Sequence, residues 1–313
     1  MRVFLFSLIL LALTVLPVAA VANSITVSVS IPPQKYFVEK IGGNAVSVTV
    51  MTAKGQDPHS YEPTAAQMEG ITKTDIYFTI GVPFETQWIS KFTSLNPNMR
   101  VVSLVSAVDR IQGKPDLALR NTLPGKGKHT PKKNDHKGHA HAGHHHHGLE
   151  TDDPHIWLSP VDMMRTVPTM VEALSQKCPD QAEVFATRAE ALLREMENLD
   201  AQIRELLAPV KARAFLTFHQ SWAHYARNYA LREASVELEG RDPGPKSMAL
   251  LIDFAKTNNI RVIVEDSMTS SSSAKAIANH LKAETIHSRP LDEDWPGALL
   301  EFSKTLAKAL GAQ

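Results

Sequence analysis

The middle of the chain carries a long stripe of apolar side chains at helical spacing. Its members lie three, four or seven residues apart: Phe185, Leu192, Met196, Leu199, Ile203 and Leu206. The spacing predicts one helix from Gln181 to Leu207, about 40 Å long at 1.5 Å per residue, with Asp180 as its cap. A helix of this length can run along two domains and join them rigidly, although one long packing helix within a single domain is an alternative.

Segments on both sides of this helix alternate between strand and helix patterns. The expected strands cover residues 24–30, 46–51, 75–80, 101–104, 214–218 and 260–264. The expected helices cover residues 34–41, 64–73, 161–177, 222–229, 247–257, 273–281 and 295–310. Because this alternation is typical of parallel sheets with crossover helices, we predict an α/β fold. The expected boundaries are an N-terminal domain over 23–178, a linking helix over 179–208 and a C-terminal domain over 209–313.

The first 22 residues have the pattern of a secretory signal peptide. Arg2 is followed by an apolar run to Leu16 and by small residues at Ala20 and Ala22, which predicts cleavage after Ala22. A membrane anchor is the alternative, but the run is shorter than the ~20 residues that span a bilayer. The residue directly after the cleavage point is Asn23 and not a cysteine, so we expect export to the periplasm without a lipid anchor.

Charge balance and cysteine content exclude several classes of protein. Lys+Arg and Asp+Glu both number 33 and aromatic residues make up 6% of the chain, so neither charge nor stacking favours a nucleic-acid partner. Cys178 is the only cysteine, which excludes an internal disulfide and a cysteine-based zinc finger.

Histidine is concentrated in one low-complexity segment. Between Asn121 and Gly148 the chain is rich in Lys, Gly and Pro, and it holds eight of the 14 histidines: His129, His136, His139, His141, His144, His145, His146 and His147. Such a composition cannot form a core, so a disordered insertion over 121–148 is expected. Its histidines would form a flexible trap that collects zinc weakly; a neutral spacer is the alternative.

Three other histidines occupy positions that suit a metal site. His59 lies shortly after the expected strand 46–51, His155 opens the ordered region after the insertion, and His219 directly follows the expected strand 214–218. Ligands bind at the carboxyl ends of parallel strands, so these side chains are expected to converge. Three neutral imidazoles with one open position are a common zinc arrangement. Three separate histidines, on the surface or hydrogen-bonded, are the alternative.

The sequences around these histidines resemble those of a known family. Asp57-Pro58-His59-Ser60-Tyr61-Glu62-Pro63, Asp153-Pro154-His155-Ile156-Trp157-Leu158-Ser159-Pro160 and Phe218-His219 are similar to motifs of the metal-binding proteins of bacterial zinc and manganese ABC importers. The resemblance implies two domains with four-stranded parallel sheets, a rigid linking helix and one metal in the interdomain cleft. It also implies that His59, His155 and His219 are the ligands. A histidine in the third position is typical of the zinc binders, and a carboxylate of the manganese binders.

The chain departs from the family pattern near its C-terminal end. Arg289 stands where the family commonly has an acidic fourth ligand, and Arg cannot bind a cation. The fourth position is then left to water, Asp292 or Asp294. We expect Arg289 to turn outward or to pair with an acid such as Asp292, Asp294 or Glu265. Glu265, where the family also has Glu, is expected to orient a ligand histidine, with a solvent-facing acid as the alternative.

The resemblance implies a receptor rather than an enzyme. Such a protein captures Zn²⁺ outside the inner membrane, as a monomer, and delivers it to an ABC permease with a cytoplasmic ATPase; an auxiliary periplasmic metallochaperone is a further candidate partner. A manganese or iron receptor is the alternative within the family. An exported zinc hydrolase with the same three histidines is another, but the sequence has no HExxH motif. A metal buffer or adhesin that works without a permease is the last alternative.

Overall fold

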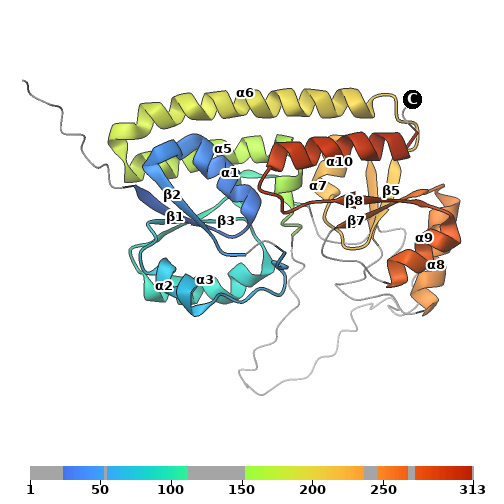
Figure 1. The fold of residues 1–313 in the computed structure, drawn as a ribbon, viewed down its shortest axis with the longest axis horizontal. Helices are drawn as coiled ribbons and strands as arrows, with labels where there is room; N and C mark the ends of the chain where they lie inside the picture. The colour runs from blue at the N-terminus through green and yellow to red at the C-terminus, as the bar shows by residue number, and fades with distance from the viewer. Residues whose placement is uncertain (1–23, 53–54, 112–151, 236–244, 267–271, 312–313) are drawn as a thin grey trace, which may run out of the picture.

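The computed structural model describes residues 24–52, 55–111, 152–235, 245–266 and 272–311. The predicted signal peptide at 1–22 and the predicted insertion at 121–148 lie outside these residues. The described chain forms two four-stranded parallel sheets with helices around them and one long helix along both (Figure 1). The predicted α/β class is therefore confirmed. Within these residues, no helix combines the length and apolar character that crossing a bilayer requires.

The first sheet has the strand order β2-β1-β3-β4, and all neighbouring strands are parallel. Its strands are β1 (Ile25–Val29), β2 (Val46–Val50), β3 (Ile76–Thr79) and β4 (Arg100–Ser103). The helices of this half are α1 (Pro32–Gly42), α2 (Ala65–Ile71), α3 (Pro83–Leu95) and α5 (Pro160–Lys177). The sheet lies between α1 and α5 on one side and α2 and α3 on the other (Figure 1).

The second sheet repeats this arrangement with the order β6-β5-β7-β8. Its strands are β5 (Ala214–Thr217), β6 (Arg232–Ser235), β7 (Val262–Asp266) and β8 (Glu284–Ser288). The helices of this half are α7 (Ala223–Asn228), α8 (Pro245–Thr257), α9 (Ser272–Leu281) and α10 (Trp295–Ala309). In both sheets the first strand of the half is central, so the loop that follows it opens at the middle of the carboxyl edge.

Three elements were not predicted from the sequence. The edge strands β6 and β8 have the sequences REAS and ETIHS, which lack an apolar run because an edge strand is only partly covered. Helix α3 has several Ser, Thr and aromatic residues, whose helix propensity is weak, but it buries Phe84 and Phe92. In these segments tertiary packing outweighs local preference.

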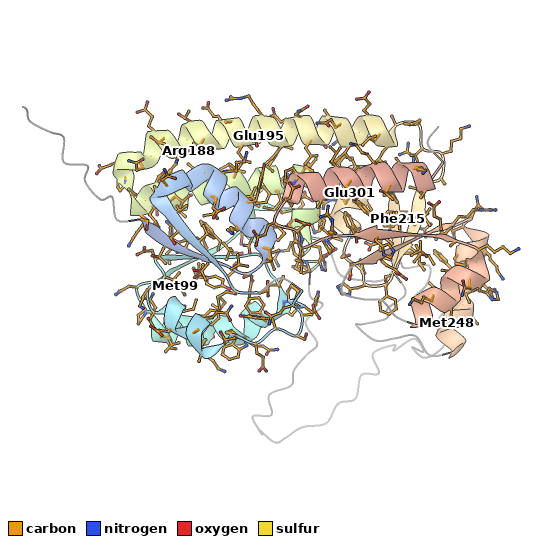
Figure 2. The ribbon with its side chains drawn as sticks, in the orientation of Figure 1. Met99, Arg188, Glu195, Phe215, Met248 and Glu301 are labelled. Carbon is orange, nitrogen blue, oxygen red and sulfur yellow. The ribbon has the colours of Figure 1, made fainter. Side chains whose placement is uncertain are left out.

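The long helix α6 (Ala182–Leu207) joins the two halves as predicted. Its buried side chains form one stripe: Phe185, Ala189, Leu192, Met196, Leu199, Ile203 and Leu207. It packs against α1 and α5 in the first half and α10 in the second. Arg188 Nη1 donates to the Gly42 carbonyl oxygen at 2.8 Å, and Lys40 Nζ lies 2.7 Å from Glu195 Oε2. Figure 2 labels Arg188 and Glu195 on this helix. The expected cap by Asp180 is wrong, because Gln181 is the N-cap and makes no side-chain cap.

The two halves are joined by a large buried cluster, which includes side chains of both sheets together with α1, α5, α6 and α10. A second, smaller cluster lies within the second half and includes side chains of β5, β7, α8 and α9. At the junction, Trp157 Nε1 donates to the Pro290 carbonyl oxygen at 2.8 Å, and Trp295 Nε1 donates to the Trp157 carbonyl oxygen at 2.6 Å. The Phe37 and Trp295 rings are 4.7 Å apart between centroids. Because a close-packed core resists deformation, these contacts fix how the halves face each other.

Glu85, near the start of α3, is a buried carboxylate of the first half. Its Oε1 accepts hydrogen bonds from Ser30 Oγ and from the Ile80 N–H at 2.9 Å, and its Oε2 accepts one from the Gly81 N–H at 2.8 Å. Burial raises the pKa of Glu85 to about 7, although the three hydrogen bonds oppose this shift.

Glu85 is expected to lower the free energy of unfolding as pH rises from about 4.5 to about 7. Over this range the folded protein keeps the carboxyl proton while the unfolded chain loses it, so the contribution is at most about 3 kcal/mol. Thermal unfolding of the metal-free protein between pH 5 and 8 tests this against Glu85→Gln. The variant should have the flatter pH dependence, and parallel curves for the two proteins would contradict the expectation.

Candidate metal centre

The structure brings the three predicted histidines together. One potential ligand atom from each of His59, His155 and His219 lies within 4.8 Å of the other two. The ring centroids are 4.6 Å apart for His59 and His219, 5.3 Å for His155 and His219, and 5.7 Å for His59 and His155. Tetrahedral zinc with Zn–N bonds of about 2.0–2.1 Å places its nitrogens about 3.3 Å apart, so small side-chain movements would close the group around an ion.

The loops that carry these histidines come from both halves of the fold. His59 lies beyond β2, His155 lies at the start of the short 3-10 turn Ile156–Leu158, and His219 follows β5. His155 is buried, with 5% exposure, whereas His219 is half-buried and His59 is exposed. The group therefore has one inner histidine and one that is accessible to solvent.

The two Asp-Pro-His motifs present their histidines through the same local turn. Asp57 Oδ1 accepts a hydrogen bond from the His59 N–H at 2.9 Å, and Asp153 Oδ1 accepts one from the His155 N–H at 2.9 Å. An aspartate that accepts the N–H two residues ahead forms an Asx turn, and the intervening proline restricts the backbone further. This chemistry explains the shared spacing of the two motifs.

Asp153 also orients the imidazole of His155. Asp153 Oδ1 lies 2.6 Å from His155 Nδ1, so the ring donates from Nδ1 and Nε2 is the nitrogen left with a lone pair for a cation. Burial would raise the pKa of the Asp153 carboxyl, but the charge and hydrogen bonds of His155, together with the charge of His224, lower it below its usual value. The negative charge on Asp153 makes His155 a better ligand for a cation.

This role of Asp153 was not predicted from the sequence, although the residue belongs to the second Asp-Pro-His motif. Glu265 was expected to orient a ligand histidine instead. The Glu265 carboxylate is buried and lies 3.9 Å from Nδ1 of the exposed His287. The carboxylate that contacts the His155 ring is thus that of Asp153, two residues before it in sequence.

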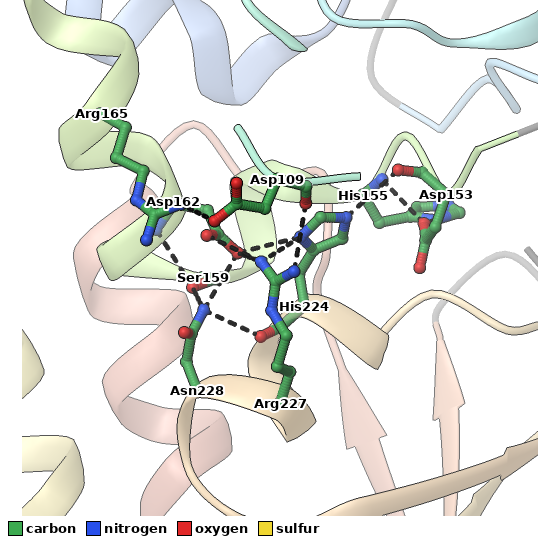
Figure 3. Close-up of polar contacts among 9 residues, drawn as sticks. All are labelled: Asp109, Asp153, His155, Ser159, Asp162, Arg165, His224, Arg227 and Asn228. Atoms are coloured by element: carbon green, nitrogen blue, oxygen red, sulfur yellow. Dashed lines mark hydrogen bonds and ion pairs between the residues drawn. The ribbon is translucent and has the colours of Figure 1, made fainter. Parts of the chain in front are cut away.

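A buried polar network ties Asp153 to the second half (Figure 3). His224 on α7 places Nδ1 2.9 Å from Asp162 Oδ2 and Nε2 3.2 Å from the Asp153 carbonyl oxygen. Asp162 on α5 is fully buried and also accepts hydrogen bonds from Arg227 Nη2 and Asn228 Nδ2, each at 3.0 Å. His224 lies outside the group of three histidines and connects the two halves directly behind it.

The acidic residues considered for a fourth ligand have other contacts. Arg289 Nη1 donates to Asp292 Oδ2 at 2.5 Å and Nη2 donates to Glu301 Oε2 at 2.5 Å. This agrees with the expectation that Arg289 pairs with an acid such as Asp292. Asp294 is the N-cap of α10 and accepts from the Gly297 N–H at 3.3 Å. Among the described residues, the group of ligand atoms consists of the three histidines and includes neither Asp292 nor Asp294.

Two parallel α/β halves joined by a long helix, with three clustered imidazoles, define a metal-binding solute receptor. The chain belongs to the family described as ZnuA, zinc-uptake complex component A, periplasmic, whose model matches residues 27–310. The predicted family is thereby confirmed. It is a family of solute-binding proteins, not of enzymes.

Relatives of known structure or description agree with this assignment. A crystal structure of ZnuA is 30% identical, with a TM-score of 0.77, and covers 92% of this chain and 100% of its own. A zinc-bound ZnuA deletion mutant is 32% identical, with a TM-score of 0.77 and coverage of 93% and 100%. The zinc-binding lipoprotein AdcA of Streptococcus pneumoniae (strain ATCC BAA-255 / R6) is 27% identical over 262 residues, which are 83% of this chain and 48% of AdcA. This chain thus spans about half the length of that relative.

Proposed function

We propose that this protein is a zinc receptor that binds Zn²⁺ through His59, His155 and His219. The proposal rests on one observation: the ligand atoms that converge in the described residues are imidazole nitrogens, with no carboxylate oxygen among them. Imidazole suits Zn²⁺, whereas Mn²⁺ prefers oxygen ligands. Water would complete the fourth position and would be the ligand that is most easily exchanged.

The burial of the histidines supports an order of capture. The exposed His59 would meet the hydrated ion first, and the oriented Nε2 of the buried His155 would then replace further water. Each ligand must be neutral to bind the ion, so protons compete with zinc and the affinity should fall as the pH is lowered. Acidification is accordingly one way to release the ion.

We infer that delivery is to an ABC permease in the inner membrane with its ATPase. The family description as a component of a zinc-uptake complex supports this partner. We also propose that residues 1–22 direct export and that the protein works in the periplasm without a lipid anchor. It would be a monomer with an N-terminal domain over 23–178, a linking helix over 179–208 and a C-terminal domain over 209–313.

Competition between metals tests the proposed function. Titration calorimetry on metal-free protein should show one tight zinc site and a manganese affinity lower by orders of magnitude. The comparison matters because a Mn-bound relative from Candidatus Liberibacter asiaticus shares this fold at 18% identity, with a TM-score of 0.73 and coverage of 91% and 99%. Equal affinities, or tighter binding of manganese, would contradict a zinc receptor.

Deletion of residues 121–148 is expected to remove weak zinc sites and to leave the tight one. The three histidines of the cluster lie outside this segment, and the segment lacks the apolar residues of a core. Titration should therefore show a lower total stoichiometry with an unchanged first binding step, and thermal unfolding should be unchanged. Loss of the tight step would mean that the tight site involves the histidines of the deleted segment.

A further inference from the structure

The short loop that carries His219 is held at both ends by a single carboxylate oxygen. Glu233 Oε1 accepts a hydrogen bond from Thr217 Oγ1 at 2.7 Å, two residues before His219. The same atom accepts from the Ser221 N–H at 3.0 Å and the Trp222 N–H at 3.1 Å, two and three residues after it. The loop therefore closes around one acceptor, with His219 at its centre.

Glu233 reaches this loop from the neighbouring strand. It lies on the edge strand β6, paired with Phe215 of β5, and its Oε2 is buried without a hydrogen-bond partner among the described residues. Burial raises the pKa of Glu233 to about 7; the Thr217 hydroxyl lowers it, the charge of Asp153 raises it, and the two N–H groups lower it. Burial of the Glu233 carboxyl is thus unfavourable, and the three hydrogen bonds that Oε1 accepts are what offsets this cost. An apolar side chain would leave the two N–H groups without this acceptor.

We propose that Glu233 is a positioning residue for metal binding, which fixes the loop from Thr217 to Trp222 so that the His219 imidazole meets those of His59 and His155. The inference rests on the proposed function, because it needs His219 to be a ligand. A ligand must be held within about 0.5 Å of its productive place, and His219 stands on a loop with no helix or strand of its own. Glu233 supplies the missing rigidity.

Glu85 offers a matched control in the other half. It is also buried and accepts hydrogen bonds from two successive N–H groups, of Ile80 and Gly81, and from a serine hydroxyl. The loop that it holds follows β3 and carries none of the three histidines. Replacement of either glutamate removes equivalent contacts, but only Glu233 is bonded on both sides of a ligand.

Three substitutions of Glu233, with Glu85→Ala as the control, distinguish the length of the side chain from its charge. Glu233→Gln keeps an oxygen that can accept the same three hydrogen bonds, so zinc affinity should stay within about 3-fold of the wild type. Glu233→Ala removes the acceptor, and Glu233→Asp keeps the charge but is one methylene too short; both should weaken zinc binding about 10- to 100-fold. Glu85→Ala should change zinc affinity by less than about 3-fold. Zinc titration of each folded variant gives these values, and Glu233→Asp decides the matter if Glu233→Ala does not fold.

A double-mutant cycle with His219→Ala distinguishes positioning from a general loss of structure. Once His219 is gone, Glu233→Asp should weaken zinc binding no further, because the two residues act through one contact. Additive losses would overturn the positioning role, as would wild-type affinity in Glu233→Asp or a loss in Glu233→Gln equal to that in Glu233→Asp. If His219→Ala alone left the affinity unchanged, the proposed three-histidine site itself would be refuted.

Discussion

His155→Ala is expected to lower the zinc affinity by more than 100-fold while the protein stays folded. Removal of a residue that merely orients a ligand typically costs about 10- to 100-fold in affinity, so removal of the ligand itself should cost more. His155 is the most buried of the three histidines, and Asp153 already orients its ring. Little free energy is therefore needed to order the His155 side chain when the ion binds. His155→Ala should accordingly remove the whole contribution of this ligand to the affinity.

Titration calorimetry with zinc measures this effect, and it should be repeated for His59→Ala and His219→Ala. The matched control is His280→Ala, because His280 is exposed on α9 and its ring contacts Lys256. All variants should lack residues 121–148, so that weak binding by that segment does not obscure the tight step. Near-normal affinity in any one variant would remove that histidine from the ligand set.

Asp153→Ala is expected to weaken zinc binding about 10- to 100-fold. The substitution removes the acceptor of both the His155 N–H and the His155 Nδ1–H, so the turn loosens and the ring loses its preferred tautomer. It also removes a buried negative charge from beside the cation. Both effects reduce affinity without removing a ligand.

Asp153→Asn separates the two effects. Both hydrogen bonds go to Oδ1, which an asparagine oxygen can replace, so this variant keeps the orientation and loses only the charge. We expect its affinity to lie between those of the wild type and Asp153→Ala. Identical affinities for the wild type and Asp153→Ala would show that neither the hydrogen bonds nor the charge of Asp153 contributes to zinc binding.

Local sequence patterns predicted much of the fold because they are set by neighbours in the chain. The apolar stripe of α6 follows from helical periodicity alone, and its predicted limits differ from Ala182–Leu207 by one residue. Six of the strands and most of the helices were also predicted from the local pattern of apolar residues. The patterns failed at β6 and β8, where an edge position permits polar residues, and at Asp180, where the chain makes a 3-10 turn before α6 begins.

The sequence by itself determined the turn that presents each Asp-Pro-His motif, since an Asx turn needs only residues next to one another. Only the tertiary structure decided that His59, His155 and His219 meet, because strand order and the shared core bring their loops to one place. It also decided the pairing of Arg289 with Asp292 and Glu301 and the contact of Glu233 with the His219 loop. Side chains on different elements meet only when packing places their backbones, and no local pattern encodes that distance.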